Sequence, residues 1–176
     1  ILHWSICDHT LCSAHRVGLA TALDPQPHQY NKGAKAAMHT PTKTLDLICL
    51  GRASVDLYGQ QIGDRLQDVG SFAKSLGGSS CNIAFGAARL GLKASMLTRV
   101  GDEQFGQFIR EELQKAGCDT SHVVTDPKRL TALAILSIKT KDQFPLLFYR
   151  TDCADMAIDC SDFDEAYIAS SKALLI

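Results

Sequence analysis

A glycine-rich segment that leads into a helix of small residues, LGGSSCNIAFGAARLG at residues 76–91, restricts the fold of this chain more than any other feature. Glycine tolerates positive φ angles and lets the backbone approach a ligand closely. Ser79 or Ser80 can cap the helix that follows. The free N–H groups of the first helical turn and the side chain of Asn82, one turn later, can face the same ligand. The segment therefore predicts the floor of a pocket for a hydroxyl-rich small molecule.

Apolar runs on both sides of this segment predict a parallel sheet. LDLICLG at 45–51 and ASMLTRVG at 94–101 are typical of buried strands, and Gly91 closes the helix expected over 80–90 between them. The pattern further predicts an amphipathic helix at 103–117, a strand at 121–124, a helix at 161–171 capped by Ser161, and a strand that begins at 173. Strands that alternate with helices form parallel sheets with right-handed crossovers, so the fold class expected is α/β.

Three segments do not fit that layer: DLYGQQI at 56–62, TALAILSIK at 131–139 and PLLFYR at 145–150. The last two predict an antiparallel hairpin, which beside an α/β core would form an accessory sheet or lid. Ligands of open α/β sheets bind beyond the carboxyl ends of the strands. Because Asp56 follows the first strand closely, we expect its carboxylate at that edge.

Composition excludes several classes of function. The formal net charge of −1 gives no electrostatic basis for binding nucleic acid or an anionic membrane, and no apolar run is long enough to cross a bilayer. Seven cysteines without a C-x-x-C pair favour a reduced, cytoplasmic protein with buried thiols. Cys81 lies within the glycine segment, so a thiol sensitive to oxidation or alkylation is expected near the pocket.

Residues 1–43 differ from the rest and are expected to be a disordered leader to a folded part at 44–176. They hold five of the six histidines and the only tryptophan, and they show no clear period. A zinc site could be drawn through His3, Cys7, His9, Cys12 and His15. Their spacing matches no ligand pattern, so we predict no metal there. Because the chain begins without Met and stops inside an apolar run, we expect it to be a fragment.

Three segments that occur in order resemble the amino-terminal half of the PfkB, or ribokinase-like, carbohydrate kinases: GRASVDLYG (51–59), LGGSSCNIAFGAARLG (76–91) and TRVGDEQFG (98–106). Residues 130–158, with F-Y-R followed by C-A-D-M-A, are most similar to the members that phosphorylate 5-dehydro-2-deoxygluconate, a sugar acid of bacterial inositol catabolism. The resemblance covers about 45–176. It implies a ribokinase-like (Rossmann-like) parallel sheet flanked by helices, with a small β lid, incomplete in this chain.

The resemblance also assigns substrate-binding residues. Asp56 would accept hydrogen bonds from sugar hydroxyls, Gly77 and Gly78 would bring the backbone against the sugar, and Asn82 would bind a hydroxyl or keto oxygen. Arg150 would bind the carboxylate of a sugar acid through two hydrogen bonds. Each residue has a structural alternative: a turn cap for the aspartate, a tight turn for the glycines, a backbone-bonded amide for the asparagine and an exposed strand end for the arginine.

The reaction implied is transfer of the γ-phosphoryl group of ATP, with Mg²⁺, to a primary hydroxyl. In the family a later Gly-Ala-Gly-Asp segment supplies the catalytic base, and the nucleotide pocket follows it. This chain contains neither that segment nor a P-loop, so we expect the base and most ATP and Mg²⁺ contacts beyond residue 176, and no activity from the chain alone. Two alternatives stay open. One is a kinase for another substrate, such as 2-keto-3-deoxygluconate or fructose. The other is a non-catalytic sugar-binding or dimerisation module, since lid sheets in the family pair between subunits.

Overall fold

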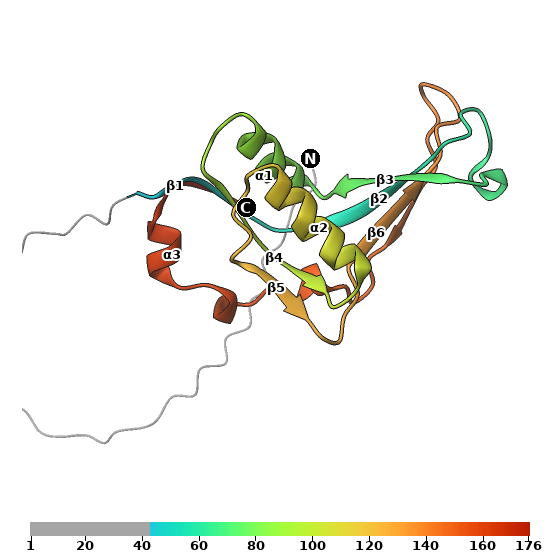
Figure 1. Ribbon diagram of the computed structural model, residues 1–176. Coiled ribbons are helices and arrows are strands. Elements are labelled where there is room, and N and C mark those ends of the chain that lie inside the picture. Colours follow the sequence, from blue (N-terminus) through green and yellow to red (C-terminus); the bar gives the residue numbers. More distant parts are fainter. Residues whose placement is uncertain (1–42) are drawn as a thin grey trace, which may run out of the picture. The chain divides into compact units, whose positions relative to one another are not determined.

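The computed structural model of the protein describes residues 43–176 (Figure 1). The predicted leader, except for Lys43, and the histidine–cysteine set drawn through it lie outside the described residues. In chain order the elements are β1 (Leu45–Leu50), β2 (Ser54–Gly59), β3 (Phe72–Gly77), α1 (Ser79–Arg89), β4 (Ala94–Gly101), α2 (Gln104–Lys115), β5 (Val123–Asp126), β6 (Ala132–Leu136), β7 (Leu146–Tyr149), α3 (Glu165–Ala169) and β8 (Ser171–Leu175). Short 3₁₀ helices occur at Leu66–Asp68, Ala154–Ala157 and Cys160–Asp162. Within this part of the chain, none of the helices combines the length and the apolar character that crossing a membrane requires.

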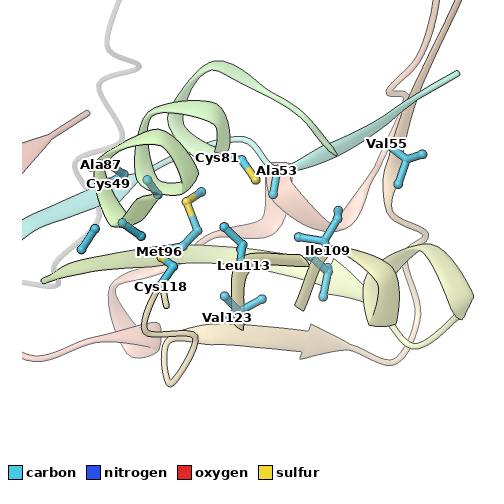
Figure 2. Packing of buried hydrophobic residues seen from close by; sticks show 14 residues of the cluster. Cys49, Ala53, Val55, Cys81, Ala87, Met96, Ile109, Leu113, Cys118 and Val123 are labelled. Carbon is cyan, nitrogen blue, oxygen red and sulfur yellow. The ribbon is translucent and has the colours of Figure 1, made fainter. Parts of the chain in front are cut away.

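The first sheet is the parallel layer that the apolar runs predicted. Its strand order is β5-β4-β1-β8, and all three pairings are parallel, with Leu47 opposite both Ala94 and Ala173. Helix α1 contacts β1 and β4, and α2 contacts β4. Figure 2 shows Met96 of β4 in one buried cluster with Cys81 of α1 and Leu113 of α2. The core fixes the position of α1, and therefore of the glycine pair that precedes it.

The second sheet contains the predicted hairpin and two further strands. Its order is β3-β2-β6-β7, in which β2 is antiparallel to β3 and parallel to β6, and β6 and β7 are antiparallel. Figure 1 shows β2, β3 and β6 extending together away from α3. The sequence predicted Asp56 at the edge of the first sheet, after β1, and the structure places it within a strand of the second sheet. Gly51, at φ 141°, follows the end of β1, a new strand begins at Ser54, and Asp56 is the third residue of that strand.

The predicted N-terminal caps of two helices were wrong. Helix α1 has Gly78 as its N-cap, at φ 90° and without a side-chain cap, so Ser79 and Ser80 form the first turn. Ser161 lies in the last 3₁₀ helix, and α3 begins after Asp164, whose carboxylate accepts a hydrogen bond from the Tyr167 N–H at 2.7 Å. A carboxylate caps a helix at least as well as a hydroxyl, so the later acidic residue sets the start of α3.

An ion pair ties β4 to the segment that precedes α3. The Arg99 guanidinium donates from Nε to Asp162 Oδ2 at 2.8 Å and from Nη2 to Oδ1 at 2.7 Å. This two-bond contact holds the pKa of Asp162 below its ordinary value. Asp126, at the end of β5, also lies 3.8 Å from the same guanidinium. Charge therefore holds the segment before α3 against strand β4.

Candidate functional site

Four strand ends meet at one end of the second sheet. Ser54, the first residue of β2, pairs with Gly77, the last of β3, and with Ala132, the first of β6. Tyr149, the last residue of β7, pairs with Leu133, so Arg150 follows at the same end. Since α1 begins immediately after β3, this end of the sheet also meets the start of a helix.

The Asp56 carboxylate lies against the backbone of Gly77. A Cβ atom at position 77 would overlap the carboxylate and would lie 2.6 Å from Ser54 Oγ. The Ser54 hydroxyl donates a hydrogen bond to Asp56 Oδ1 at 3.4 Å. Partial burial raises the pKa of Asp56, while the Ser54 hydrogen bond and the charge of Arg52 act against that shift. A half-buried carboxylate beside bare backbone can accept hydrogen bonds from ligand hydroxyls.

Because residue 78 is a glycine, helix α1 can begin in close contact with the loop that joins β1 and β2. A Cβ atom at this position would overlap the carbonyl oxygen of Arg52, to which the Cys81 N–H donates at 3.3 Å. One turn into the helix, the Asn82 N–H donates to Gly78 O at 2.9 Å, and the Asn82 side chain is exposed. The structure thus brings Asp56, Gly77 and Gly78 together and leaves the Asn82 amide accessible. Their roles toward a sugar stay predictions.

Arg150 is engaged with a buried carboxylate of its own chain. Its Nε and Nη2 atoms donate to Asp155 Oδ2 at 3.0 and 2.7 Å, and the Asp155 side chain is fully buried. Asp155 Oδ1 finds no hydrogen-bond partner among the described residues. Breaking this pair to bind a ligand would leave the buried charge uncompensated, which is costly. The role of Arg150 as the carboxylate ligand of a sugar acid stays a prediction, and a structural role is now evident beside it.

Sequence reasoning missed Arg52 as a site residue. Its guanidinium carbon lies over the Phe148 ring, 5.5 Å from the centroid, and its charge acts on Asp56. Arg52 and Phe148 lie far apart in the chain, and only the pairing of β2, β6 and β7 brings them together. One local signal was present, since Arg52 stands four residues before Asp56 in the segment GRASVDLYG.

A hollow of about 690 Å³ lies beside β7. Apolar and aromatic residues such as Phe105, Leu133 and Phe148 make up half of its lining, and polar or charged residues make up the other half. The residues predicted to bind the sugar do not line it: Asp56, Gly77, Gly78, Asn82 and Arg150. Across residues 43–176, no three His, Cys, Asp or Glu side chains gather as a metal site would require.

The cysteine of the glycine segment is protected rather than reactive. Cys81 is fully buried, and burial raises the pKa of its thiol to about 12. Burial likewise raises the pKa of Cys49 to about 11 and that of Cys118 to about 12. The expectation of a thiol sensitive to oxidation or alkylation was wrong, because Cys81 is buried in the hydrophobic core cluster (Figure 2).

The model of the pfkB family of carbohydrate kinases matches residues 44–176. The chain belongs to this family. The 5-dehydro-2-deoxygluconokinase of Geobacillus kaustophilus (strain HTA426) is 43% identical to it over 135 residues, which are 76% of this chain and 40% of that protein. The chain therefore spans about 40% of the length of the curated relatives that it matches. Both the family and the subgroup that the sequence motifs indicated are confirmed as its relatives.

Solved members of the pfkB family share the fold. The PfkB protein from Polaromonas sp. JS666 superposes with a TM-score of 0.68 at 32% identity, over 74% of this chain and 43% of that one. A sugar kinase, PH1459, from Pyrococcus horikoshii in complex with ATP gives a TM-score of 0.67 at 32% identity, over 73% of this chain and 41% of that one. The predicted ribokinase-like α/β fold is confirmed, with the parallel sheet and flanking helices in place.

Proposed function

We propose that residues 44–176 are the sugar-binding part of a kinase that phosphorylates 5-dehydro-2-deoxy-D-gluconate at its primary hydroxyl, in myo-inositol catabolism. One structural observation carries the binding part of this proposal: the Asp56 carboxylate packs on the bare backbone of Gly77 where β3 ends and α1 begins. The likeness to relatives named 5-dehydro-2-deoxygluconokinase supports the choice of substrate.

In this proposal the described residues position the sugar and do not activate it. Asp56 accepts hydrogen bonds from two hydroxyl groups, Gly77 and Gly78 let the ring or chain of the substrate lie on the backbone, and Asn82 donates to a keto oxygen. Holding the acceptor hydroxyl in line with the phosphoryl donor is a large part of phosphoryl-transfer catalysis. The catalytic base is not among these residues, and the proposal assigns it to another part of the protein.

ATP is the phosphoryl donor in this proposal, which the ATP complex of the Pyrococcus horikoshii kinase supports. Mg²⁺ would accompany the nucleotide and neutralise its phosphates. Since residues 43–176 offer no group of acidic side chains suited to a metal ion, we assign ATP and Mg²⁺ mainly to residues outside this part.

We further propose that the protein works in the cytoplasm and pairs with a second copy of itself through the second sheet (β3-β2-β6-β7), which is the predicted lid sheet. Strands β3 and β7 are the two edges of that sheet, and Leu146, Leu147, Phe148 and Tyr149 of β7 are all exposed. An edge strand with exposed apolar side chains is suited to pairing with another chain.

The test uses the gene product that contains residues 44–176 and compares Asp56→Asn with Asp64→Asn, a matched change at an exposed turn. ATP-dependent phosphorylation is measured on 5-dehydro-2-deoxy-D-gluconate, 2-keto-3-deoxygluconate and D-fructose. We expect the first substrate to have the highest kcat/KM, Asp56→Asn to lower it by about 100-fold, and Asp64→Asn to leave it unchanged. Preference for another sugar would overturn the substrate, and absence of turnover with all three would overturn the kinase proposal. Calorimetry on the 176-residue chain then tests for sugar binding without catalysis.

A further inference from the structure

Arg52 is a half-buried cation without an ionic partner in the described part of the chain. Four other arginines there, Arg65, Arg99, Arg129 and Arg150, form ion pairs with aspartates, whereas no carboxylate of residues 43–176 lies within ion-pair distance of Arg52. A half-buried guanidinium with free N–H groups has lost part of its hydration without replacing it. Such a group is prepared to bind an anion.

The sheet register places this cation on the same face as the predicted sugar ligand. Asp56 of β2 pairs with Ala134 of β6, and Ala134 pairs with Phe148 of β7. Residues directly opposite one another share a face of the sheet, so Asp56 and Phe148 point to the same side. The Arg52 guanidinium lies over the Phe148 ring on that side, 5.5 Å from its centroid. Its positive charge acts to lower the pKa of Asp56, against the effect of burial.

Stacking on an aromatic ring fixes the orientation of a guanidinium. The ring covers one face of the planar group, and the N–H donors at its edge stay free to form two parallel hydrogen bonds with a carboxylate. Arg150, the arginine that the sequence suggested for this task, donates from two nitrogens to the buried Asp155 instead. Of these two arginines, Arg52 is therefore the one free to receive an external carboxylate.

We propose that Arg52, held on the Phe148 ring, binds the carboxylate of the sugar acid while Asp56 binds its hydroxyl groups. This proposal rests on the proposed function and adds a determinant of specificity to it. A cation beside Asp56 also offsets the repulsion that an acidic substrate would meet from that carboxylate. A neutral sugar gains nothing from Arg52, so this residue would separate acids from neutral sugars.

The test measures the binding of two ligands that differ in one group: 5-dehydro-2-deoxy-D-gluconate and the neutral alcohol made by reducing its carboxylate. The gene product that contains residues 44–176 is compared with Arg52→Met, Arg52→Lys and Arg89→Met. Arg89 is the matched control because it also lies over a ring, 5.6 Å from the centroid of Phe85, at the exposed end of α1.

We expect Arg52→Met to weaken binding of the acid by about 10- to 150-fold, the range for lost hydrogen bonds to a charged group, and binding of the alcohol by less than about threefold. Arg52→Lys keeps the charge but not the two-bond geometry and should give an intermediate loss for the acid. Arg89→Met should change neither. If Arg52→Met fails to fold, the binding of the acid and of the alcohol is compared between wild type and Arg52→Lys instead.

Equal weakening of both ligands in the Arg52 variants, or weakening of neither, would overturn the role of Arg52 and leave the proposed function standing. A wild-type protein that binds the alcohol as well as the acid, or binds neither, would overturn the sugar-acid substrate itself. Loss of the acid preference in the Arg52 variants alone would support both proposals.

Discussion

Replacing Gly77 by alanine should separate sugar binding from fold stability. A Cβ atom at this position would lie 2.6 Å from Ser54 Oγ and would overlap the Asp56 carboxylate. Gly77 is not among the residues with positive φ, so its backbone can accept alanine without strain. The methyl group therefore acts on its neighbours alone, and both the Ser54 hydroxyl and the Asp56 carboxylate, the predicted ligand of the sugar hydroxyls, must give way.

The size of the effect follows from how far the carboxylate must move. To clear a Cβ atom the Asp56 carboxylate has to shift by about 1 Å, and a misplacement of that size costs about 100-fold, or about 2.7 kcal/mol. The loss of stability should be smaller. Asp56 is only half-buried and can turn toward solvent, so we expect about 1 kcal/mol, the lower end of the range for overpacking.

Gly86→Ala provides the control. A Cβ atom at Gly86 meets nothing within 4 Å, and the residue lies inside helix α1, where alanine is favoured over glycine by about 1 kcal/mol. Urea denaturation should therefore show a higher free energy of unfolding for Gly86→Ala and a slightly lower one for Gly77→Ala. In kinetic assays only Gly77→Ala should raise KM for the sugar acid or lower its kcat/KM. A Gly77→Ala protein that keeps sugar affinity within about threefold of wild type would refute the placement of Asp56 at the sugar.

Three further outcomes follow from the charges and thiols of the described residues. Because burial raises the pKa of Asp56 above its ordinary value of 3.8, its ionisation destabilises the fold as pH rises through that range. Asp56→Asn should therefore raise the melting temperature at pH 7, and the gain should vanish toward pH 3; a gain independent of pH would contradict this cause. Arg99→Met should lower the free energy of unfolding by about 3 kcal/mol, the lower end of the range for a broken buried ion pair, because it leaves the Asp162 carboxylate without its cation. Since the pKa of Asp162 is lowered in the folded protein, the loss of stability should be full at neutral pH and should shrink as pH falls below 3.8. Urea denaturation at pH 7 and at pH 3 measures the free energy of unfolding at each value, and an equal loss at both would contradict the ion pair. Iodoacetamide at pH 8 should label the exposed Cys160 in the native protein and Cys81 only after unfolding, as peptide mass spectrometry would show; native labelling of Cys81 at the rate of Cys160 would contradict its burial.

The local pattern of the sequence was sufficient for the first sheet and its helices. The apolar runs that predicted strands at 45–51 and 94–101 correspond to β1 and β4, and the amphipathic stripe at 103–117 corresponds to α2. The hairpin of β6 and β7 was also predicted correctly. These elements carry their own signal, because burial on one or both faces selects apolar residues at a fixed period.

Strand β3 had no such signal. Its first four residues, Phe72 to Ser75, are all exposed, so burial imposes no apolar alternation on them. The strand forms because β2 supplies the backbone hydrogen bonds along its whole length, from Ser54 opposite Gly77 to Gly59 opposite Phe72. An edge strand of this kind is determined by its partner and not by its own composition.

The sequence by itself determined the family motifs and the identity of the residues that could hold a sugar: Asp56, Gly77, Gly78, Asn82 and Arg150. Only the tertiary structure decided which of these side chains are near one another. Strand pairing places Asp56 on the second sheet against Gly77. Arg150 forms an ion pair with Asp155, and Arg52 lies over the ring of Phe148. Contacts between residues far apart in the chain depend on strand register and packing, which the local periodicity of the sequence does not encode.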